Sequence, residues 1–305
     1  MSGTADSTIR RFNNVVERTL AYCFGLGWLT GTRLLITILA SRLARRESVT
    51  VRLAGVSDAV FLRPCSSDVT VFTQTFARRE YDMATMRHAQ DTGWLDPSRS
   101  QDLVVVDCGA NIGLSTVWFA REFPHASIVA IEPEVDNFRL LERNARAYGA
   151  RCICAGVWNE KTTLHISNPR ASRHAFQVSR FMEPESDNAR TIEAITLNEV
   201  VAWYPNRRFL VKIDIEGAES ALFHDNIEWL DAVDLLIVEI HDWLMPWQGT
   251  SLNVLKAIVA QKFEVQWRGE NLFCFRTGTS SGGATRLLES SLALSVPVGA
   301  SISEG

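Results

Sequence analysis

Several sequence features are absent from this chain, and each absence narrows the range of functions. The six cysteines include no Cys-x-x-Cys pair, which disfavours a zinc site or a thiol-exchange motif. They are scattered, and several lie in apolar, strand-like runs. We therefore expect buried free thiols in a reducing, cytoplasmic compartment. The six positions are Cys23, Cys65, Cys108, Cys152, Cys154 and Cys274.

An excess of positive charge is also absent. The chain has 31 Lys and Arg against 35 Asp and Glu, so its formal net charge is -4. Nucleic-acid binding usually requires a basic field, which this balance does not provide. We expect a small-molecule partner and no nucleic acid. The charge is uneven, because seven arginines and three acids in residues 1–50 give that part about +4.

The chain lacks an apolar run suited to crossing a membrane. The apolar segment Leu20–Leu43 has Arg33 near its middle, and three glycines, Gly25, Gly27 and Gly31, weaken it as a helix. No small-residue cleavage signal follows Met1 closely, so we expect no secretory leader. Two alternatives stay open for this segment. We favour a helix packed on its own protein, and the other is a weak peripheral contact with a membrane surface.

Strands and helices alternate along the rest of the sequence, which predicts an α/β fold with a doubly wound sheet. Two apolar runs near the end, Phe263–Trp267 and Leu272–Phe275, predict an antiparallel hairpin. The other predicted strands are Leu103–Val106, Ser127–Ile131, Cys152–Val157, Thr162–Ile166, Phe209–Ile213 and Leu235–Ile240, with a strand pair in Val49–Leu62. The predicted helices are Leu114–Phe123, Val135–Tyr148, Ala218–Phe223 and Ser251–Gln261, and Ser67–Tyr81 leads into a helix.

These elements suggest four parts of the chain. Residues 1–48 form a basic helical N-terminal arm, and residues 49–100 form an extension that packs on the catalytic domain. Residues 101–277 are the catalytic domain, in which 168–190 is an irregular excursion. Residues 278–305 are a flexible tail rich in Ser, Gly and Ala.

The most informative stretch is Val104-Val105-Val106-Asp107-Cys108-Gly109-Ala110-Asn111-Ile112-Gly113, a buried strand that leads through a glycine turn into a helix. Ligands of open α/β sheets bind beyond the carboxyl ends of the strands, which is where this turn lies. Asp107 stands where the dinucleotide motif Gly-x-Gly-x-x-Gly has its first glycine. A carboxylate there repels a pyrophosphate and suits an ammonium group, such as that of S-adenosylmethionine.

Other side chains complete the predicted nucleoside site. Glu132 follows the next strand, 25 residues after Asp107, at a spacing suited to hydrogen bonds with ribose hydroxyls. Ser115 or Thr116 is a candidate for holding the methionine carboxylate, and Val157 and Trp158 are candidates for flanking the adenine. The structural alternatives are a helix cap for Asp107 or Ser115, a turn requirement for Gly109 and Gly113, a solvated acid at a strand end for Glu132, and a core position for Trp158. Asn111 belongs to the same turn.

The chain resembles the FkbM-type methyltransferases over roughly residues 61–275. The most specific segment is Val211-Lys212-Ile213-Asp214-Ile215-Glu216-Gly217-Ala218-Glu219, and the others are Phe61-Leu62-Arg63-Pro64, Ser67-Asp68, Glu80-Tyr81, the glycine turn, Ile131-Glu132-Pro133 and Val238-Glu239-Ile240-His241. The resemblance implies a Rossmann-like class I methyltransferase with a mostly parallel seven-stranded sheet. It also implies O-methylation of a hydroxyl on a sugar, glycolipid or polyketide-like small molecule, with S-adenosylmethionine as cofactor.

Methyl transfer to an alcohol needs a group that removes a proton. Asp214, Glu216, Glu239 and His241 follow two neighbouring predicted strands, so we expect them beside the cofactor turn. His241 is the predicted base because its ordinary pKa is near neutral pH, with Asp214 and Glu239 as catalytic partners and Asp214 also near the cofactor. A divalent cation held by Asp214, Glu216 and Glu239 is the alternative, although no spacing is diagnostic and no metal is predicted. The alternative functions are a nicotinamide-dependent oxidoreductase and a non-catalytic binding module.

Overall fold

The computed structural model describes residues 17–53, 59–91, 93–94, 96–166, 178–179, 191–243, 247 and 249–277. The predicted tail at 278–305, the first part of the predicted arm and nearly all of the predicted excursion at 168–190 lie outside these residues.

A seven-stranded sheet forms the centre of the protein, with the strand order β12-β13-β11-β10-β3-β4-β5. The four pairings from β11 to β5 are parallel, whereas β13 is antiparallel to both β11 and β12. This is the predicted sheet with its antiparallel hairpin at one edge. The strands are β3 (Leu103–Cys108), β4 (Ser127–Ile131), β5 (Arg151–Ile153), β10 (Arg208–Ile213), β11 (Val233–Glu239), β12 (Phe263–Arg268) and β13 (Asn271–Arg276).

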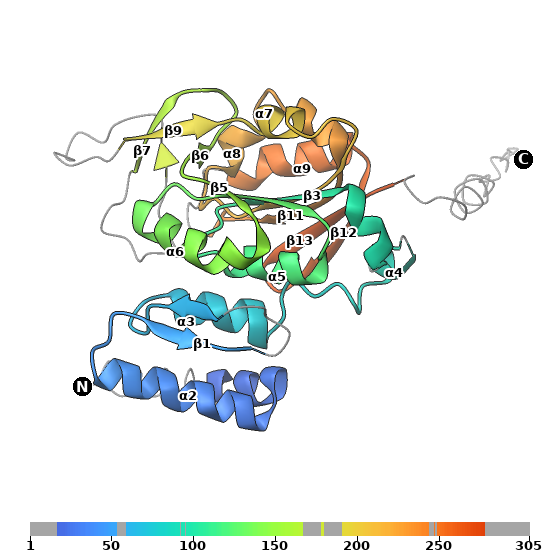
Figure 1. Ribbon diagram of the computed structural model, residues 1–305. Coiled ribbons are helices and arrows are strands. Elements are labelled where there is room, and N and C mark those ends of the chain that lie inside the picture. Colours follow the sequence, from blue (N-terminus) through green and yellow to red (C-terminus); the bar gives the residue numbers. More distant parts are fainter. Residues whose placement is uncertain are drawn as a thin grey trace, which may run out of the picture.

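Helices cover both faces of the sheet (Figure 1), which gives the three layers of a Rossmann-like fold. α5 (Leu114–Glu122) and α6 (Val135–Ala145) lie on one face. α7 (Leu197–Ala202), α8 (Glu219–Leu222) and α9 (Thr250–Ala260) lie on the other. Alternate residues of the central strand supply the two cores: Val105 packs in one, and Val104 and Val106 pack in the other.

A second, smaller sheet corrects one strand prediction. The predicted strand Cys152–Val157 is two strands, because the chain leaves the main sheet after β5 and pairs elsewhere as β6 (Gly156–Val157). β6 is parallel to β9 (Thr191–Ile195), which is antiparallel to β7 (Thr163–Ile166), and β7 in turn pairs with β8 (Val178–Ser179). The sequence prediction omitted β8, β9 and α7. A capping box of Thr196 and Glu199 begins α7.

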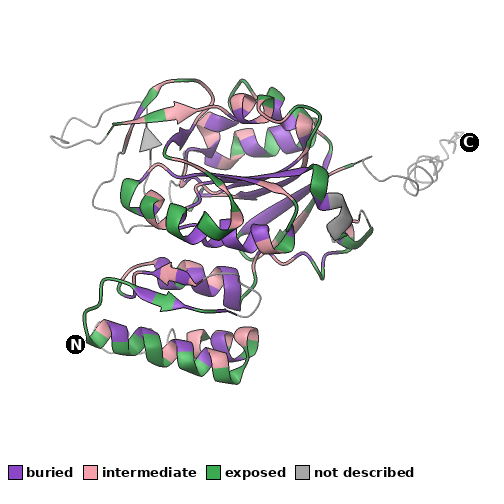
Figure 2. Cartoon of the chain, in the orientation of Figure 1, coloured by how far each residue is buried: buried purple, intermediate pink, exposed green. Residues whose placement is uncertain are grey.

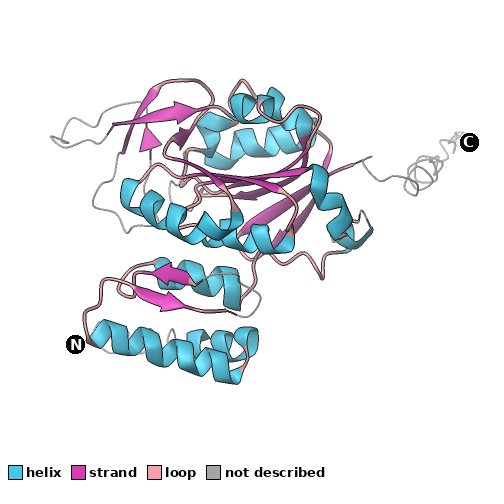
Figure 3. Cartoon of the chain, in the orientation of Figure 1, coloured by secondary structure: helices cyan, strands magenta, loops and turns pink. Residues whose placement is uncertain are grey.

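The N-terminal part forms a further layer beside α5 and α6 (Figures 1 and 3). Residues 17–26 are helical, and α2 (Trp28–Leu43) follows after Gly27, whose φ of 82° breaks the helix. The antiparallel pair β1 (Val49–Val51) and β2 (Val60–Leu62) is the predicted strand pair. The helical turns α3 (Asp68–Phe72), a π-helical turn at Thr73–Ala77 and α4 (Arg87–Asp91) come next, and the 3-10 turn Pro97–Asp102 leads into β3. In the part of the chain that the structure describes, no helix is long and apolar enough to span a bilayer.

The cysteines differ in part from the prediction. All six are free thiols, as expected. Cys23, Cys108 and Cys274 are buried, but Cys65 and Cys154 are exposed and Cys152 is only partly buried. The expectation that all six are buried is therefore wrong, because Cys65 lies in a surface turn after β2 and Cys154 lies in the crossing between the two sheets.

Candidate functional site

The glycine turn and the predicted acidic site residues lie at the carboxyl ends of the parallel strands of the main sheet. The glycine turn follows β3, Glu132 follows β4, Asp214 follows β10 and Glu239 ends β11. These strands are parallel neighbours, so their carboxyl ends share one edge. The order along the sheet reverses between β3 and β10, and such a reversal is where open α/β sheets bind ligands.

The glycine turn is held in place by the chain itself. Gly109 has a φ of 73°, and a Cβ atom there would lie 1.8 Å from the carbonyl oxygen of Asp214. Gly113 has a φ of 85°, and its Cβ would lie 2.8 Å from Leu141 Cδ1. Asn111 also has a positive φ, 52°. The packing of the turn thus explains both glycines, and the predicted approach of a ligand to them stays a prediction.

Asp107 is fully buried below the turn and receives its partners from the protein. Ser115 Oγ and Thr116 Oγ1 each donate a hydrogen bond of 2.7 Å to Asp107 Oδ2. Lys212 Nζ lies 3.3 Å from Asp107 Oδ1, because Lys212 is the register partner of Asp107 between β10 and β3. The ammonium group beside this carboxylate is therefore that of Lys212. The predicted contacts of Asp107 and Ser115 with a ligand are untested, and both side chains are engaged within the protein.

Lys212 connects the glycine turn with the next loop. Its side chain is 2% exposed, and its Nζ donates a hydrogen bond of 3.0 Å to the carbonyl oxygen of Gly109. The same nitrogen lies 3.2 Å from Asp214 Oδ2. Burial alone would lower the pKa of Lys212, but the charges of Asp214 and Asp107 outweigh it and raise the pKa well above the ordinary value. The charged side chain of Lys212 thus links the ends of β3 and β10.

Glu132 lies beside the glycine turn, as the spacing predicts. Its Oε2 accepts a hydrogen bond of 2.9 Å from the backbone N–H of Asn111. Its Oε1 accepts bonds from the backbone N–H of Glu134 (3.0 Å) and from Asn137 Nδ2 (3.3 Å). Burial raises the pKa of Glu132 to about 7, against the opposing effect of these hydrogen bonds. Val157 is buried and Trp158 partly buried in the core on the α7–α9 side of the sheet, and their predicted contact with an adenine stays a prediction.

An acidic cluster surrounds His241 at the ends of β10 and β11. His241 is 1% exposed, and its Nδ1 lies 2.8 Å from Glu219 Oε1. Its Nε2 lies 3.5 Å from Glu239 Oε1, 3.6 Å from Asp214 Oδ1 and 3.7 Å from Glu216 Oε2. Glu219, a residue to which the sequence assigned no role, is 1% exposed and begins α8. Its only sequence signal was its place in the Lys212–Glu219 motif.

The charges in this cluster correct the argument for His241 as a base. Burial lowers the pKa of His241, but hydrogen bonds to Glu219 and Glu239 and the charges of Glu219 and Asp214 outweigh it and raise the pKa to about 11. His241 therefore carries its proton at neutral pH, and the premise of an ordinary pKa is wrong. Burial also raises the pKa of Glu216, to about 8, and that of Glu239, and the negative charge of Asp214 adds to both shifts.

The cluster is compact enough for a cation. One ligand atom from each of Asp214, Glu216 and His241 lies within 4.8 Å of the others. The cation alternative drawn from the sequence used Glu239 in place of His241. Because ion pairs between a protonated histidine and carboxylates bring the same atoms together, this closeness does not by itself require a metal.

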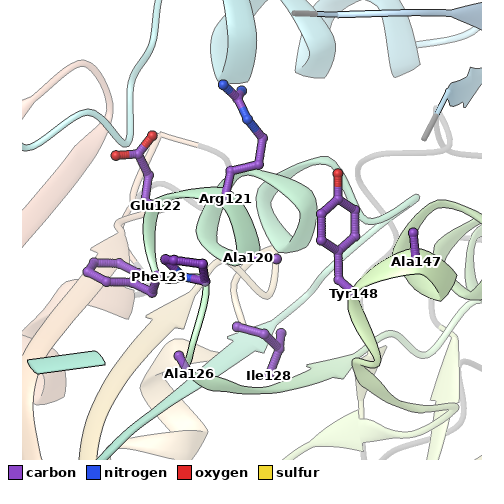
Figure 4. A pocket seen from close by; sticks show the side chains of 9 residues that line it. Ala120, Arg121, Glu122, Phe123, Ala126, Ile128, Ala147 and Tyr148 are labelled. Atoms are coloured by element: carbon purple, nitrogen blue, oxygen red, sulfur yellow. The ribbon is translucent and has the colours of Figure 1, made fainter. Parts of the chain in front are cut away.

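A separate hollow of about 450 Å³ lies at the amino ends of the parallel strands. Figure 4 shows side chains of Arg121, Phe123 and Tyr148 around it, and Ile128 near the amino end of β4 forms part of its wall. The candidate site is at the carboxyl ends of the strands, so this hollow contributes nothing to it.

Comparisons with known proteins agree with the sequence motifs. Residues 107–264 match the family model described as "Methyltransferase FkbM domain". "Methyltransferase 1" of Beauveria bassiana is 26% identical in an alignment of 164 residues that covers 46% of this chain and 66% of that protein. "Hexuronic acid methyltransferase AglP" of Haloferax volcanii is 30% identical in an alignment of 159 residues that covers 50% of this chain and 62% of that protein. The chain thus spans less than two thirds of these relatives.

Solved structures with a similar chain trace were also found. An O-methyltransferase from Bacillus cereus in complex with SAH has a TM-score of 0.34 and 11% identity, and the match covers 68% of this chain and 89% of that one. A methyltransferase from Geobacter sulfurreducens has a TM-score of 0.33 and 15% identity, with 68% and 88% covered.

Proposed function

We propose that this protein transfers a methyl group from S-adenosylmethionine to a hydroxyl of a small molecule. The premise is that the chain belongs to the FkbM methyltransferase family. The family match covers just over half of the chain and includes the glycine turn, Glu132 and the whole acidic cluster. The observation that carries the proposal is the direct hydrogen bond between Glu132 and the turn at Asn111, which joins the two predicted halves of a nucleoside site.

The residues present fit the cofactor at this edge of the sheet. A carboxylate offers about four lone-pair positions, and Glu132 uses three of them for Asn111, Glu134 and Asn137. Glu132 Oε2 accepts one of these bonds, so it keeps capacity for a ribose hydroxyl. When bound, S-adenosylmethionine supplies the activated methyl group. Lys212 fixes the turn below it through Asp107 and the carbonyl oxygen of Gly109.

The acidic cluster supplies the proton acceptor in this proposal. The side chains of Asp214, Glu216 and Glu239 are 25%, 18% and 15% exposed, whereas that of His241 is 1% exposed. An acceptor hydroxyl therefore reaches the carboxylates first. Asp214 or Glu239 takes the hydroxyl proton, and the protonated His241 behind them holds both carboxylates in position.

The family and one relative support the proposed substrate class. The name of the Haloferax volcanii relative states a hexuronic acid as its substrate, which supports a sugar hydroxyl as the acceptor. A glycolipid or a polyketide-like product with a similar hydroxyl belongs to the same class. The net charge of -4 gives no support to a nucleic-acid substrate.

A screen of hydroxylated acceptors with a methyl-labelled donor tests the proposal. We expect label in a product that carries a new methyl ether, together with release of S-adenosylhomocysteine. Asp214→Asn combined with Glu239→Gln serves as the site variant, and Asp225→Asn is a control on an exposed aspartate after α8. The proposal fails if transfer is equal in both variants, or if acceptors from every hydroxyl class stay unlabelled while S-adenosylmethionine binds.

A further inference from the structure

The outer face of the N-terminal helices is apolar and exposed. Leu29, Ile36 and Leu43 are seven residues apart along α2 and so lie on one side of that helix, 83%, 61% and 87% exposed. Phe24, from the preceding helix, is 74% exposed, and its ring contacts Trp28 with the centroids 6.1 Å apart. We call these five residues, with Leu20 and Leu39, the outer apolar face. Figure 2 shows exposed residues along the side of α2 that points away from the rest of the protein.

The opposite side of the same helices is firmly packed. Leu34 and Ile38 of α2 are buried in the core that also contains β1 and β2. Gly31 lies so close to the backbone of Tyr22 that a Cβ would be 2.5 Å from its carbonyl oxygen. Arg42 Nε donates a hydrogen bond of 2.6 Å to the carbonyl oxygen of Pro64. The two helices that carry the outer apolar face are therefore packed firmly on the protein by their opposite side.

Positive charge borders this apolar surface. Residues 17–48 contain five arginines and two glutamates, which gives a formal charge of +3, whereas the whole chain has -4. Arg33 lies on the exposed side of α2, and Arg45 and Arg46 follow its end, also exposed. Leucines and aromatic rings flanked by arginines are the composition of helices that lie in the interface of an anionic membrane.

We propose that the outer apolar face docks the protein on the surface of a membrane that contains anionic lipids. The helices lie parallel to the membrane, with Phe24, Trp28 and Leu29 among the acyl chains and the arginines at the headgroups. A second copy of the chain fits less well, because a two-fold interface through this face would bring the arginines of both copies together. None of these residues belongs to the methyl-transfer site, so docking is a function beyond the proposed reaction.

Cosedimentation of the full chain with vesicles tests the docking. We expect binding to vesicles of phosphatidylcholine and phosphatidylglycerol in equal parts, weaker binding to phosphatidylcholine alone, and a decrease with added salt. Leu29→Ser with Leu43→Ser should weaken partition by about tenfold or more, because two exposed leucines no longer enter the acyl region. Arg33→Gln with Arg45→Gln should weaken it by about fivefold per arginine on the anionic vesicles only.

A matched control separates docking from general stickiness. Leu252 and Val259 of α9 are 55% and 76% exposed, and Leu252→Ser with Val259→Ser should leave vesicle binding unchanged. Binding of S-adenosylmethionine by all variants shows that they are folded. Equal binding by the control variant and the Leu29/Leu43 variant overturns the proposal.

Two measurements distinguish the other occupants. Quenching by brominated lipids should affect the fluorescence of the wild type more than that of Trp28→Phe, because Trp28 is placed among the acyl chains. Sedimentation velocity should give a monomer without vesicles. A dimer that Leu29→Ser with Leu43→Ser dissociates, and that does not bind vesicles, assigns the face to a second copy and overturns the proposal. If the wild type binds no vesicles and is a monomer, the proposal is also wrong.

Discussion

Lys212→Met is the substitution that most directly tests how the site is held together. The Lys212 side chain is 2% exposed, and Asp107, its register partner, is 0% exposed. Removing one member of a buried ion pair leaves the other charge unpaired and typically costs about 3–5 kcal/mol. Lys212 also donates to the carbonyl oxygen of Gly109, which adds to the loss. We expect the free energy of unfolding to fall by about 4 kcal/mol and the Tm to fall by roughly 10 °C.

Urea unfolding followed by circular dichroism measures the loss. Lys161→Met is the matched control, because Lys161 is 74% exposed and its ion pair with Glu199 lies at the surface. We expect that control to cost about 1 kcal/mol or less. Adding Asp107→Asn to Lys212→Met should restore about 2 kcal/mol, because the unpaired charge is removed while Ser115 and Thr116 keep an oxygen acceptor. If Lys212→Met lowers the free energy of unfolding no more than the control does, the buried ion pair between Lys212 and Asp107 does not stabilise the fold.

Three further predictions concern the site. Burial raises the pKa of Glu132 from 4.5 to about 7, so the folded protein binds the carboxyl proton more tightly than the unfolded chain does. This proton stabilises the folded protein below pH 4.5, and the stabilisation is lost as the pH rises through about 7. Glu132→Gln should therefore flatten the fall of unfolding free energy across this window by about 3 kcal/mol in urea titrations, and an unchanged slope contradicts the shift. His241→Ala should lower turnover and leave the affinity for S-adenosylmethionine within about twofold, because the ring positions Asp214 and Glu239 behind the reacting groups. Full turnover in that variant removes His241 from the mechanism. Methyl transfer should persist in EDTA, since the proton on His241 balances the carboxylates; loss of turnover that Mg²⁺ restores supports the cation alternative instead.

The sequence predicted the main sheet well because its central strands are continuous apolar runs between recognisable turns. Val104–Val106 and Phe209–Val211 are apolar and buried, and a short apolar run between turns is typical of a strand in the middle of a parallel sheet. The break between β5 and β6 was missed because Cys152–Val157 continues one apolar pattern across both sheets. β9 was not predicted because its five residues are only partly buried or exposed, and a strand outside the core gives only a weak hydrophobic pattern in the sequence.

The sequence predicted which residues lie together at the carboxyl ends of the strands, but it did not predict their contacts and charges, and their role as a site stays a prediction. The spacing of Glu132 from Asp107 was sufficient to place both at one edge, because parallel neighbours end together. The partner of Asp107 depends on the register between β3 and β10, which the sequence does not reveal. The proton on His241 depends on the carboxylates of Asp214, Glu219 and Glu239, and Glu219 lies 22 residues away in the sequence. A pKa set by such a cluster has no signature in local sequence.

Calorimetric titration of the full chain with S-adenosylmethionine, S-adenosylhomocysteine and NAD tests the central claim most directly. The account predicts that S-adenosylmethionine and S-adenosylhomocysteine bind at one site per chain and that NAD does not bind. Glu132→Ala should weaken the binding of both nucleosides by about tenfold or more, because the hydrogen bond between this carboxylate and the ribose is lost. Glu142→Ala, a change at an exposed glutamate of α6, should have no effect. Binding of NAD alone, or equal affinity of the Glu132→Ala and wild-type proteins for S-adenosylmethionine, would contradict it.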